Sequence, residues 1–253
     1  MEKDNILTEQ LVNDLFFKKP YVAFLDILGF RSLVENNKHN FLVELYKLLM
    51  NFQIEFYHKN YNHKNIKIVC ISDSIILWTE DSKEKTLIEL VEAVKFLLLH
   101  SISIGIPLRG SIVKDNVTAI ESNGTLSLVG LGLVRAYENE NIQNWSGCMV
   151  ENQIIKTIEN HHKVLLNNKT SYIQSLNSLL VKTEIPIKIK KEEKTIIGYA
   201  VNWADNTTFT EIQLNESFSK FKKREKETQE IKESVEKKIE NTLIFYKKFG
   251  GRK

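Results

Sequence analysis

Two aspartates, each beside short apolar runs, are the residues best placed to carry chemistry. Asp26 lies within the stretch 21–31, and Asp73 lies in the polar tip 72–74 between the two apolar runs of 66–78. A lone carboxylate in an apolar strand is costly to bury unless a metal ion, an arginine or backbone amides pair with it. Neighbouring carboxylates repel unless a cation lies between them, and two aspartates holding two metal ions suit phosphoryl transfer. The simpler alternative is that Asp26 caps the next helix and Asp73 is an ordinary turn residue.

A strand and a hairpin must position these aspartates. The apolar run after Pro20 is short, which predicts a buried strand, and Gly29 allows a sharp turn directly after it. The two apolar runs around 72–74 predict a β-hairpin with Asp73 at its turn. If the strands pair, the two carboxylates lie side by side, and the amides of the turn after Asp26 form an anion-binding concavity.

The two motifs together resemble the catalytic domain of class III nucleotidyl cyclases. The run FLDILGF at 24–30 is similar to the family motif F-x-D-I-x-G-F, and ISDS at 71–74 is similar to its second motif, G-D. With Leu28 and Ser72 in these motifs, the chain is most similar to the bacterial Pycsar pyrimidine cyclases, over about residues 20–150. The resemblance implies an α+β fold with a ferredoxin-like core, in which helices flank a central, mainly antiparallel sheet, plus a C-terminal helical extension.

The resemblance also implies an activity. A class III cyclase converts a nucleoside triphosphate into a 3′,5′-cyclic nucleotide and pyrophosphate, and the likeness favours a pyrimidine substrate, UTP before CTP. Asp26, the Ile27 carbonyl and Asp73 would hold two Mn²⁺ or Mg²⁺ ions. The implied triphosphate contacts are Phe24, Leu28, Gly29, Phe30 and Arg31, and the implied base-recognition positions are Lys67 and Ser127. A lysine donates to a pyrimidine carbonyl as readily as to a purine nitrogen, so these two positions leave the base open.

The chain departs from the family at two positions that stabilise the transition state. Where the family has an asparagine and an arginine four residues apart, this chain has Val134 and Glu138, and neither donates hydrogen bonds to a developing negative charge. Arg109 and Arg135 are the candidate replacements. Arg109, in an apolar strand, either contacts a phosphate or an acidic partner, or closes a structural ion pair. Two alternatives stay open: an adenylate or guanylate cyclase, and a catalytically inactive nucleotide-binding module.

The partners follow from the same resemblance. Cyclases of this class work as head-to-tail homodimers, in which each site takes its two aspartates from one subunit and its base-recognition segment from the other. The product would activate a separate effector with a cyclic-nucleotide-binding domain, as part of an antiphage response.

Composition and charge exclude several other classes. Of the 253 residues, 42% are hydrophobic and 9% aromatic, as expected for a globular protein with a core. The net charge of +3 is small and Lys and Glu are interspersed, which argues against a nucleic-acid-binding protein. Cys70 and Cys148 fit a reducing compartment rather than a disulfide framework or a zinc site. The start of the chain does not resemble a signal peptide and no apolar run spans a membrane, so we expect a soluble, cytoplasmic protein.

Hydrophobic periodicity outlines the rest of the chain in three parts, 1–19, 20–150 and 151–253. The first is a leading helix, the second the cyclase-like domain, and the third an α/β extension. The pattern predicts helices over 5–17, 41–56 and 82–100, strands over 102–113, 147–150 and 195–203, a basic loop over 182–191 and one long charged helix over 216–249. Pro107 would place the strand 102–113 at an edge or a bulge, and the long helix would lay its narrow apolar stripe on the domain or on a second subunit.

Overall fold

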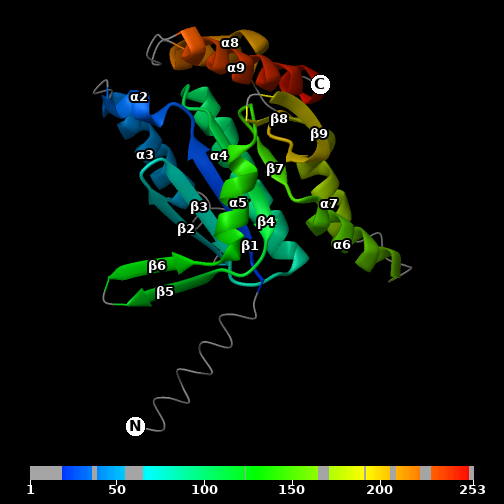
Figure 1. Ribbon diagram of the computed structural model, residues 1–253. Coiled ribbons are helices and arrows are strands. Elements are labelled where there is room, and N and C mark those ends of the chain that lie inside the picture. Colours follow the sequence, from blue (N-terminus) through cyan, green and yellow to red (C-terminus); the bar gives the residue numbers. More distant parts are fainter. Residues whose placement is uncertain are drawn as a thin grey trace.

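Strands and helices alternate through most of the chain (Figure 1). The computed structural model describes residues 19–35, 39–54, 65–122, 124–164, 171–190, 192–205, 209–222 and 229–250. The strands are β1 (Tyr21–Ile27), β2 (Ile66–Ile71), β3 (Ser74–Thr79), β4 (Leu108–Lys114), β5 (Thr118–Ser122), β6 (Thr125–Val129), β7 (Cys148–Val150), β8 (Leu180–Ile189) and β9 (Glu192–Val201). The helices are α2 (Phe30–Glu35), α3 (His39–Ile54), α4 (Glu84–Ser103), α5 (Leu131–Asn141), α6 (Asn152–Val164), α7 (Ser171–Leu179), α8 (Glu211–Lys222) and α9 (Gln229–Phe249).

A seven-stranded sheet in the order β2-β3-β1-β4-β7-β9-β8 forms the centre of the fold. Its neighbouring strands are antiparallel except for the parallel pair β4 and β7. The units β1, α3, β2, β3, α4 and β4 follow one another in the chain and pair as β2-β3-β1-β4, which is the ferredoxin-like arrangement. The expected α+β architecture, with a mainly antiparallel sheet flanked by helices and helices at the C-terminal end, is therefore confirmed.

Alternation along β1 decides which face of the sheet each side chain meets. Ala23, Leu25 and Ile27 are buried in the larger core with α3 and α4, whereas Val22 and Phe24 pack with residues of α5 and the start of β5. Successive side chains of a strand point to opposite faces, so Asp26 belongs to the α5 face. Figure 1 shows α5 lying across this face, and α8 with α9 across the end of the sheet toward which β1 runs.

The hairpin 66–78 is confirmed as β2 and β3, with Ser72 and Asp73 in its turn and Ser72 in the left-handed region at φ 56°. The strands 21–27, 147–150 and 195–203 and the helices 41–56 and 82–100 are also found, within a few residues at their ends. The predicted helix 5–17 lies outside the described residues. The predicted boundary at residue 150 falls at the end of β7, inside the sheet that β8 and β9 continue.

The prediction for Pro107 is wrong. Helix α4 continues to Ser103, Gly105 follows it at φ 74°, and the strand begins only at Leu108. Strand β4 is central, between β1 and β7, and Pro107 precedes it, so the missing amide of the proline interrupts no strand pairing. The Pro107 carbonyl instead accepts a hydrogen bond of 3.0 Å from the Leu28 amide.

The predicted basic loop 182–191 is also wrong, because most of it is strand β8. Thr183, Ile185 and Ile187 are buried, while Lys182, Glu184 and Lys188 are exposed, which is the period of a half-buried strand. Pro186 lies in its middle, and this is tolerated because β8 is an edge strand of the sheet.

The single long helix predicted over 216–249 is replaced by α8 and α9, which pack against each other. The apolar stripe of α9 is confirmed for its described side chains, since Val235, Ile239 and Tyr246 are buried against the same chain. Among the helices of the described chain, none is long and apolar enough to cross a membrane.

We expect Gly110→Ala to destabilise the protein by about 3 kcal/mol, measured as the free energy of unfolding in urea. A Cβ on Gly110 of β4 would lie 2.2 Å from Leu25 Cδ2 and 2.6 Å from the Phe24 carbonyl oxygen, so the strand that carries Asp26 would have to move. Gly198→Ala in β9 is the matched control, because its Cβ would meet the flexible end of Ile185 at 2.9 Å. Equal stability losses for the two variants would contradict this account.

Candidate active site

Strand pairing brings Asp26 and Asp73 to the same end of the sheet. Asp26 pairs with Ser74 across β1 and β3, and the Ile27 amide donates a hydrogen bond of 2.9 Å to the Asp73 carbonyl. The Asp26 side chain is 25% exposed and Asp73 is half-buried, so both are reachable from solvent. Burial raises the pKa of Asp26 and the charge of Asp73 raises it further, while Arg109 lowers it. Both predicted carboxylates therefore lie within electrostatic range of each other.

Arg109 lies directly beside this pair. It faces Asp26 across β4 and β1, and its Nη2 lies 4.0 Å from Asp26 Oδ2. Its Nε donates to Glu140 Oε1, and its Nη1 donates to the Gln143 carbonyl at 2.8 Å. The side chain is only 12% exposed. Arg109 thus closes a structural ion pair with Glu140 and places positive charge beside a predicted metal ligand, while its contact with a phosphate stays a prediction.

Glu140 belongs to the charged cluster around Arg109, and the sequence analysis did not predict it. It lies on α5 with 2% of its surface exposed, and burial raises the pKa of its carboxyl to about 7. Arg109 opposes this rise, whereas the charges of Asp26 and Asp73 add to it. In the sequence, Glu140 is one acid in the polar run ENEN at 138–141, with no apolar neighbour to mark it as buried. Only its pairing with a residue 31 positions away reveals its role.

Gln143 holds this arrangement in place from the loop after α5. Its side-chain amide donates to the Gly110 carbonyl at 2.7 Å, and its amide oxygen accepts from Trp145 Nε1 at 2.9 Å. Because the Gln143 carbonyl also accepts from Arg109, one buried residue fixes the arginine and the strand beside it.

Arg135, the other predicted cation, lies elsewhere in the chain. Its Nη1 lies 2.5 Å from Asp115 Oδ2, and its Nη2 pairs with Glu151. Asp115 follows the far end of β4, six positions beyond Arg109, which is roughly 20 Å at about 3.3 Å per residue. Val134 is an exposed side chain of α5. Within one chain, the structure does not bring Arg135 to Asp26.

The two base-recognition positions are also remote from Asp26 in the same chain. Lys67 of β2 pairs with Trp78 of β3, and Trp78 pairs with Val22 of β1. Val22 precedes Asp26 by four positions on β1, so Lys67 lies roughly 13 Å from Asp26 along the strand direction. Its Nζ lies 3.1 Å from Glu80 Oε1. Ser127 lies on β6, exposed, in the separate two-stranded sheet that β5 and β6 form.

The turn after Asp26 has the predicted shape, but one of its amides is already used. Gly29 adopts φ 75°, a conformation that favours glycine, and α2 begins directly after it. The Leu28 amide donates to Pro107, so Gly29, Phe30 and Arg31 remain the candidates for phosphate contacts by their amides.

Two predicted contact side chains have partners within the fold. The Arg31 side chain is 90% exposed and donates from Nε to Glu35 at 2.9 Å. Phe24 is half-buried and meets Tyr137 of α5 edge to face, with ring centroids 5.7 Å apart. Phe24 therefore packs β1 against α5.

The chemistry of the donors fits Mn²⁺ or Mg²⁺. Asp26 and Asp73 would supply carboxylate oxygens and Ile27 would supply a carbonyl, which are the hard ligands that these ions prefer. A nearby cation would offset the burial and mutual repulsion that raise the pKa of Asp26. Among the described residues there is no group of three or more His, Cys, Asp or Glu that could form a complete protein cage. Water and phosphate oxygens would then complete the coordination, as is usual for Mg²⁺.

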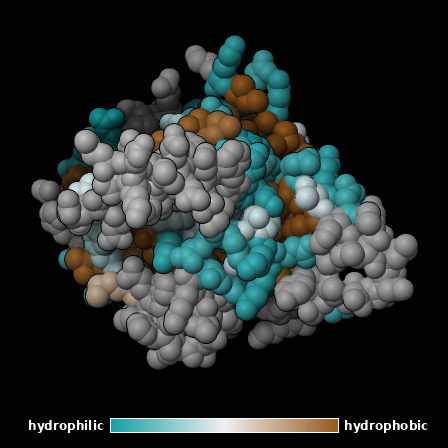
Figure 2. All heavy atoms as spheres, turned by 90° about the horizontal axis from the view of Figure 1, so that it is seen from below, coloured by the Kyte–Doolittle hydropathy of each residue, from teal (hydrophilic) through white to brown (hydrophobic). Residues whose placement is uncertain are grey.

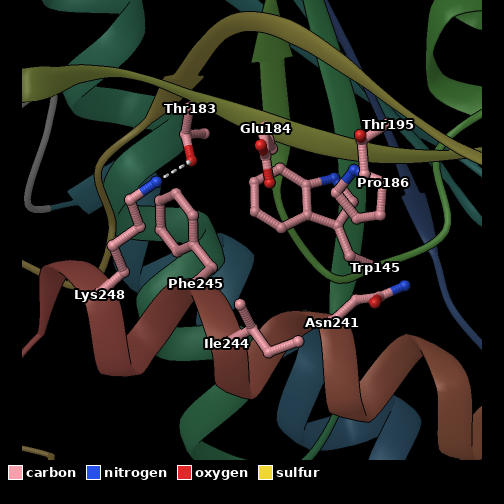
Figure 3. A pocket seen from close by; sticks show the side chains of 9 residues that line it. All are labelled: Trp145, Thr183, Glu184, Pro186, Thr195, Asn241, Ile244, Phe245 and Lys248. Atoms are coloured by element: carbon pink, nitrogen blue, oxygen red, sulfur yellow. Dashed lines mark hydrogen bonds between the residues drawn. The ribbon is translucent and has the colours of Figure 1, made fainter.

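Two cavities lie beside α9, away from these carboxylates. The first has a volume of about 130 Å³, and Figure 3 shows Asn241, Ile244, Phe245 and Lys248 of α9 facing side chains from β8 and β9, with Trp145 between them. The second, about 370 Å³, shares Pro186, Thr195 and Asn241 with the first. Neither is lined by Asp26 or Asp73.

No protein-family model matches the chain, and no curated protein matches its sequence. Similar solved structures include an adenylate cyclase from Trypanosoma brucei in its monomeric state, at 10% identity and a TM-score of 0.49, covering 76% of this chain and 93% of that one. Another is the dimeric guanylyl cyclase domain of the RhoGC fusion protein from the fungus Blastocladiella emersonii, at 14% identity and a TM-score of 0.44, covering 73% of this chain and 96% of that one. A third is a bacterial light-regulated adenylyl cyclase, at 12% identity and a TM-score of 0.42, covering 81% of this chain and 98% of that one. All three likenesses are distant.

We expect the stability of the metal-free protein to fall with rising pH because of Glu140. Its folded pKa of about 7 exceeds its ordinary value of 4.5, so the folded state holds a proton that the unfolded state has released between these two values. Relative to Glu140→Gln, the wild-type melting temperature in EDTA should therefore decline from about pH 4.5 to about pH 7 and then level off. A difference that stays constant over this window would show that Glu140 is ionised throughout.

Proposed function

We propose that the protein is a pyrimidine nucleotide cyclase, which converts UTP, or CTP, to the 3′,5′-cyclic monophosphate and pyrophosphate. The proposal rests on the placement of Asp26 and Asp73 at the same end of the sheet, with a glycine turn directly after the strand that carries Asp26. Two carboxylates beside a turn of amides suit the binding of divalent cations together with a polyphosphate. The resemblance of both motifs to class III cyclases supports the same reaction.

The residues of this end of the sheet have separate tasks in the proposed reaction. Asp26, the Ile27 carbonyl and Asp73 would hold two Mn²⁺ or Mg²⁺ ions. When bound, such ions lower the pKa of the ribose 3′-hydroxyl and neutralise the triphosphate. Amides of the turn 29–31 would orient the β- and γ-phosphates. The 3′-oxygen then attacks the α-phosphorus in line, the bond to the β-phosphate oxygen breaks, and pyrophosphate leaves.

Arg109 would act from a fixed position. Glu140 and the Gln143 carbonyl hold its guanidinium, and its Nη2 points toward Asp26 at 4.0 Å. A positive charge that needs no reorganisation is suited to stabilise negative charge as the phosphorane forms. This arrangement gives the chain one of the cations that Val134 and Glu138 cannot supply.

The choice of a pyrimidine, and of uridylate before cytidylate, rests on the likeness of the motifs to the Pycsar enzymes. We propose that the protein acts in the cytoplasm, where its product would activate a separate effector with a cyclic-nucleotide-binding domain in antiphage defence. An adenylate or guanylate cyclase is the nearest alternative, because Lys67 and Ser127 accept either class of base.

We further propose that two copies form a head-to-tail homodimer with shared sites. Lys67 and Arg135 are too far from Asp26 to serve the same site within one chain, so a second copy would supply them. Exposed apolar side chains on the β5–β6 hairpin and α5 offer a surface for it: Ile120, Leu126, Val129, Leu131, Val134 and Tyr137. The hairpin lies at the lower end of the molecule in Figure 1, and the face seen from below in Figure 2 shows apolar patches among hydrophilic side chains. A two-fold assembly would bury such a surface against itself.

An inactive nucleotide-binding module is the second candidate. It is favoured by the acid partners of both candidate arginines, since Arg109 pairs with Glu140, and Arg135 pairs with Asp115 and Glu151. The cost of keeping Asp26 and Asp73 together, seen in the raised pKa of Asp26, argues for the enzyme.

The proposal is tested by incubating the protein separately with UTP, CTP, ATP and GTP in the presence of Mn²⁺ and identifying the products by mass. We expect cyclic UMP or cyclic CMP, and a loss of about a hundredfold or more in Asp26→Asn and Asp73→Asn. Glu44→Gln is the control and should keep full activity, because Glu44 is an exposed acid of α3 that pairs with Lys47 on the same helix. Nucleotide binding without turnover would leave the inactive module, and a cyclic purine product would reassign the base.

Dimer formation is tested by placing a charge on the apolar surface. We expect Val129→Glu and Val134→Glu to shift the protein from dimer to monomer in sedimentation equilibrium and to lower cyclase activity at least about tenfold, because an unpaired carboxylate opposes burial at an interface. Val43→Glu on α3 is the matched control, since Val43 is similarly exposed at 48% but lies away from the hairpin. A wild-type protein that is active as a monomer would contradict the shared-site arrangement.

A further inference from the structure

The larger cavity beside α9 is walled by four parts of the chain, namely α9 itself, the loop after α5, and the strands β8 and β9. Its volume of about 370 Å³ lies in the range of small-molecule sites, roughly 300–1,000 Å³. Most of its lining is polar or charged, and the full set is Asn144, Pro186, Ile187, Glu193, Lys194, Thr195, Lys237 and Asn241. A ligand that fills the cavity must therefore carry polar groups of its own, because burying this lining without hydrogen bonds is unfavourable.

Asn144 is the most deeply buried polar residue of this lining, with 4% of its surface exposed. Its backbone amide donates to the Pro186 carbonyl at 2.9 Å, and its side-chain Nδ2 donates to Glu193 Oε1 at 3.2 Å. Within the described part of the chain, no donor is bonded to its Oδ1. A buried amide oxygen requires a donor, and the cavity is the side from which a ligand can supply one.

Two further acceptors line the cavity. Asn241 donates its Nδ2 to the Asn144 carbonyl at 2.7 Å, and no described residue donates to its Oδ1. Glu193 accepts from Asn144 through one carboxylate oxygen, which leaves the second oxygen for a ligand. Figure 3 shows Asn241 on α9 facing Pro186 and Thr195 of the neighbouring strands. Three acceptors, one of them negatively charged, match the three N–H donors of a primary ammonium group.

Two lysines bring positive charge to the same cavity from opposite walls. Lys237 belongs to α9 and lies 2.8 Å from Glu240, and Lys194 belongs to β9 and lies 2.6 Å from Glu192. Both ion pairs are on the surface, where such pairs contribute little free energy, so each ammonium can turn toward a ligand at small cost. Lysine ammoniums form charge-assisted hydrogen bonds with carboxylates.

We propose that this cavity binds a small zwitterion in which a primary ammonium group is joined to a carboxylate, as in an α-amino acid. The ammonium would meet the three acceptors, and the carboxylate would meet the two lysines. Pro186 and Ile187 offer apolar contact to a small side chain. Binding at this site is independent of the proposed cyclase reaction.

The cavity adjoins the segment that holds Arg109. Asn144 follows Gln143, whose carbonyl accepts from Arg109 Nη1 at 2.8 Å and whose side chain donates to the Gly110 carbonyl at 2.7 Å. A ligand bonded to Asn144 would hold this segment, and with it the guanidinium, in one position. This consequence rests on the proposed function, and we expect a saturating ligand to raise kcat for UTP about fivefold with KM nearly unchanged.

Binding is measured without nucleotide, in EDTA, by thermal shift with each of the common α-amino acids and then by calorimetry with those that raise the melting temperature. For each of these, the amine without the carboxylate and the 2-hydroxy acid without the ammonium are the matched probes. We expect both to bind at least about tenfold more weakly than the amino acid, because each lacks one set of charge-assisted hydrogen bonds. Failure of every amino acid to bind, or equal binding of the matched probes, would overturn the site.

Variants locate the ligand. We expect Lys237→Gln and Glu193→Gln each to weaken binding about tenfold, since glutamine at 193 keeps an acceptor for Asn144 and removes only the charge. Lys247→Gln is the matched control, because Lys247 is an exposed lysine of α9 that pairs with Glu211 outside this cavity. Affinity unchanged in both cavity variants would contradict the placement. A ligand that binds without changing kcat would overturn the link to Arg109, and binding by a protein that turns over no triphosphate would overturn the proposed function alone.

Discussion

The repulsion among the carboxylates of Asp26, Asp73 and Glu140 near the end of β1 is the constraint on which the surrounding structure depends. Burial raises the pKa of Asp26 and of Glu140, and Asp73 adds to both effects. Charges in a medium of low dielectric are stable only where opposite charges or hydrogen bonds compensate them. Arg109 supplies the nearest compensation. Arg109 pairs with two of these three acids, Asp26 and Glu140, so an excess of negative charge remains when all three are ionised, and such an excess favours binding of divalent cations.

The fold maintains this excess through strand register. Alternation along β1 sends Asp26 to the α5 face, where Glu140 lies, and the pairing of β1 with β4 sets Arg109 opposite Asp26. Gly110 follows Arg109 and lets β4 approach β1 so closely that a Cβ would collide with the neighbouring backbone. Because every one of these placements depends on register, a one-residue slip would move the charged side chains to opposite faces of the sheet.

Local signals in the sequence were sufficient to predict the strand and the hairpin that carry the aspartates, because each consists of short apolar runs beside a turn. The errors arose where composition and structure disagree. The segment 182–191 is rich in lysine, yet its alternate residues are buried, so it pairs as an edge strand. Glu140 and Gln143 carried no signal, since their roles come from partners about thirty positions away in the chain.

The proposed site would draw its parts from two chains. Arg109 and the turn amides of residues 29–31 belong to the chain that carries Asp26, so their contribution is independent of protein concentration. Lys67 and Arg135 lie roughly 13 Å and 20 Å along the sheet from the aspartate end, so they would serve a site only in a second, oppositely directed copy. Phosphate binding would then be a property of each chain, whereas base recognition would exist only in the assembled pair. Dilution would therefore weaken base selection and turnover before it weakened the affinity for the polyphosphate.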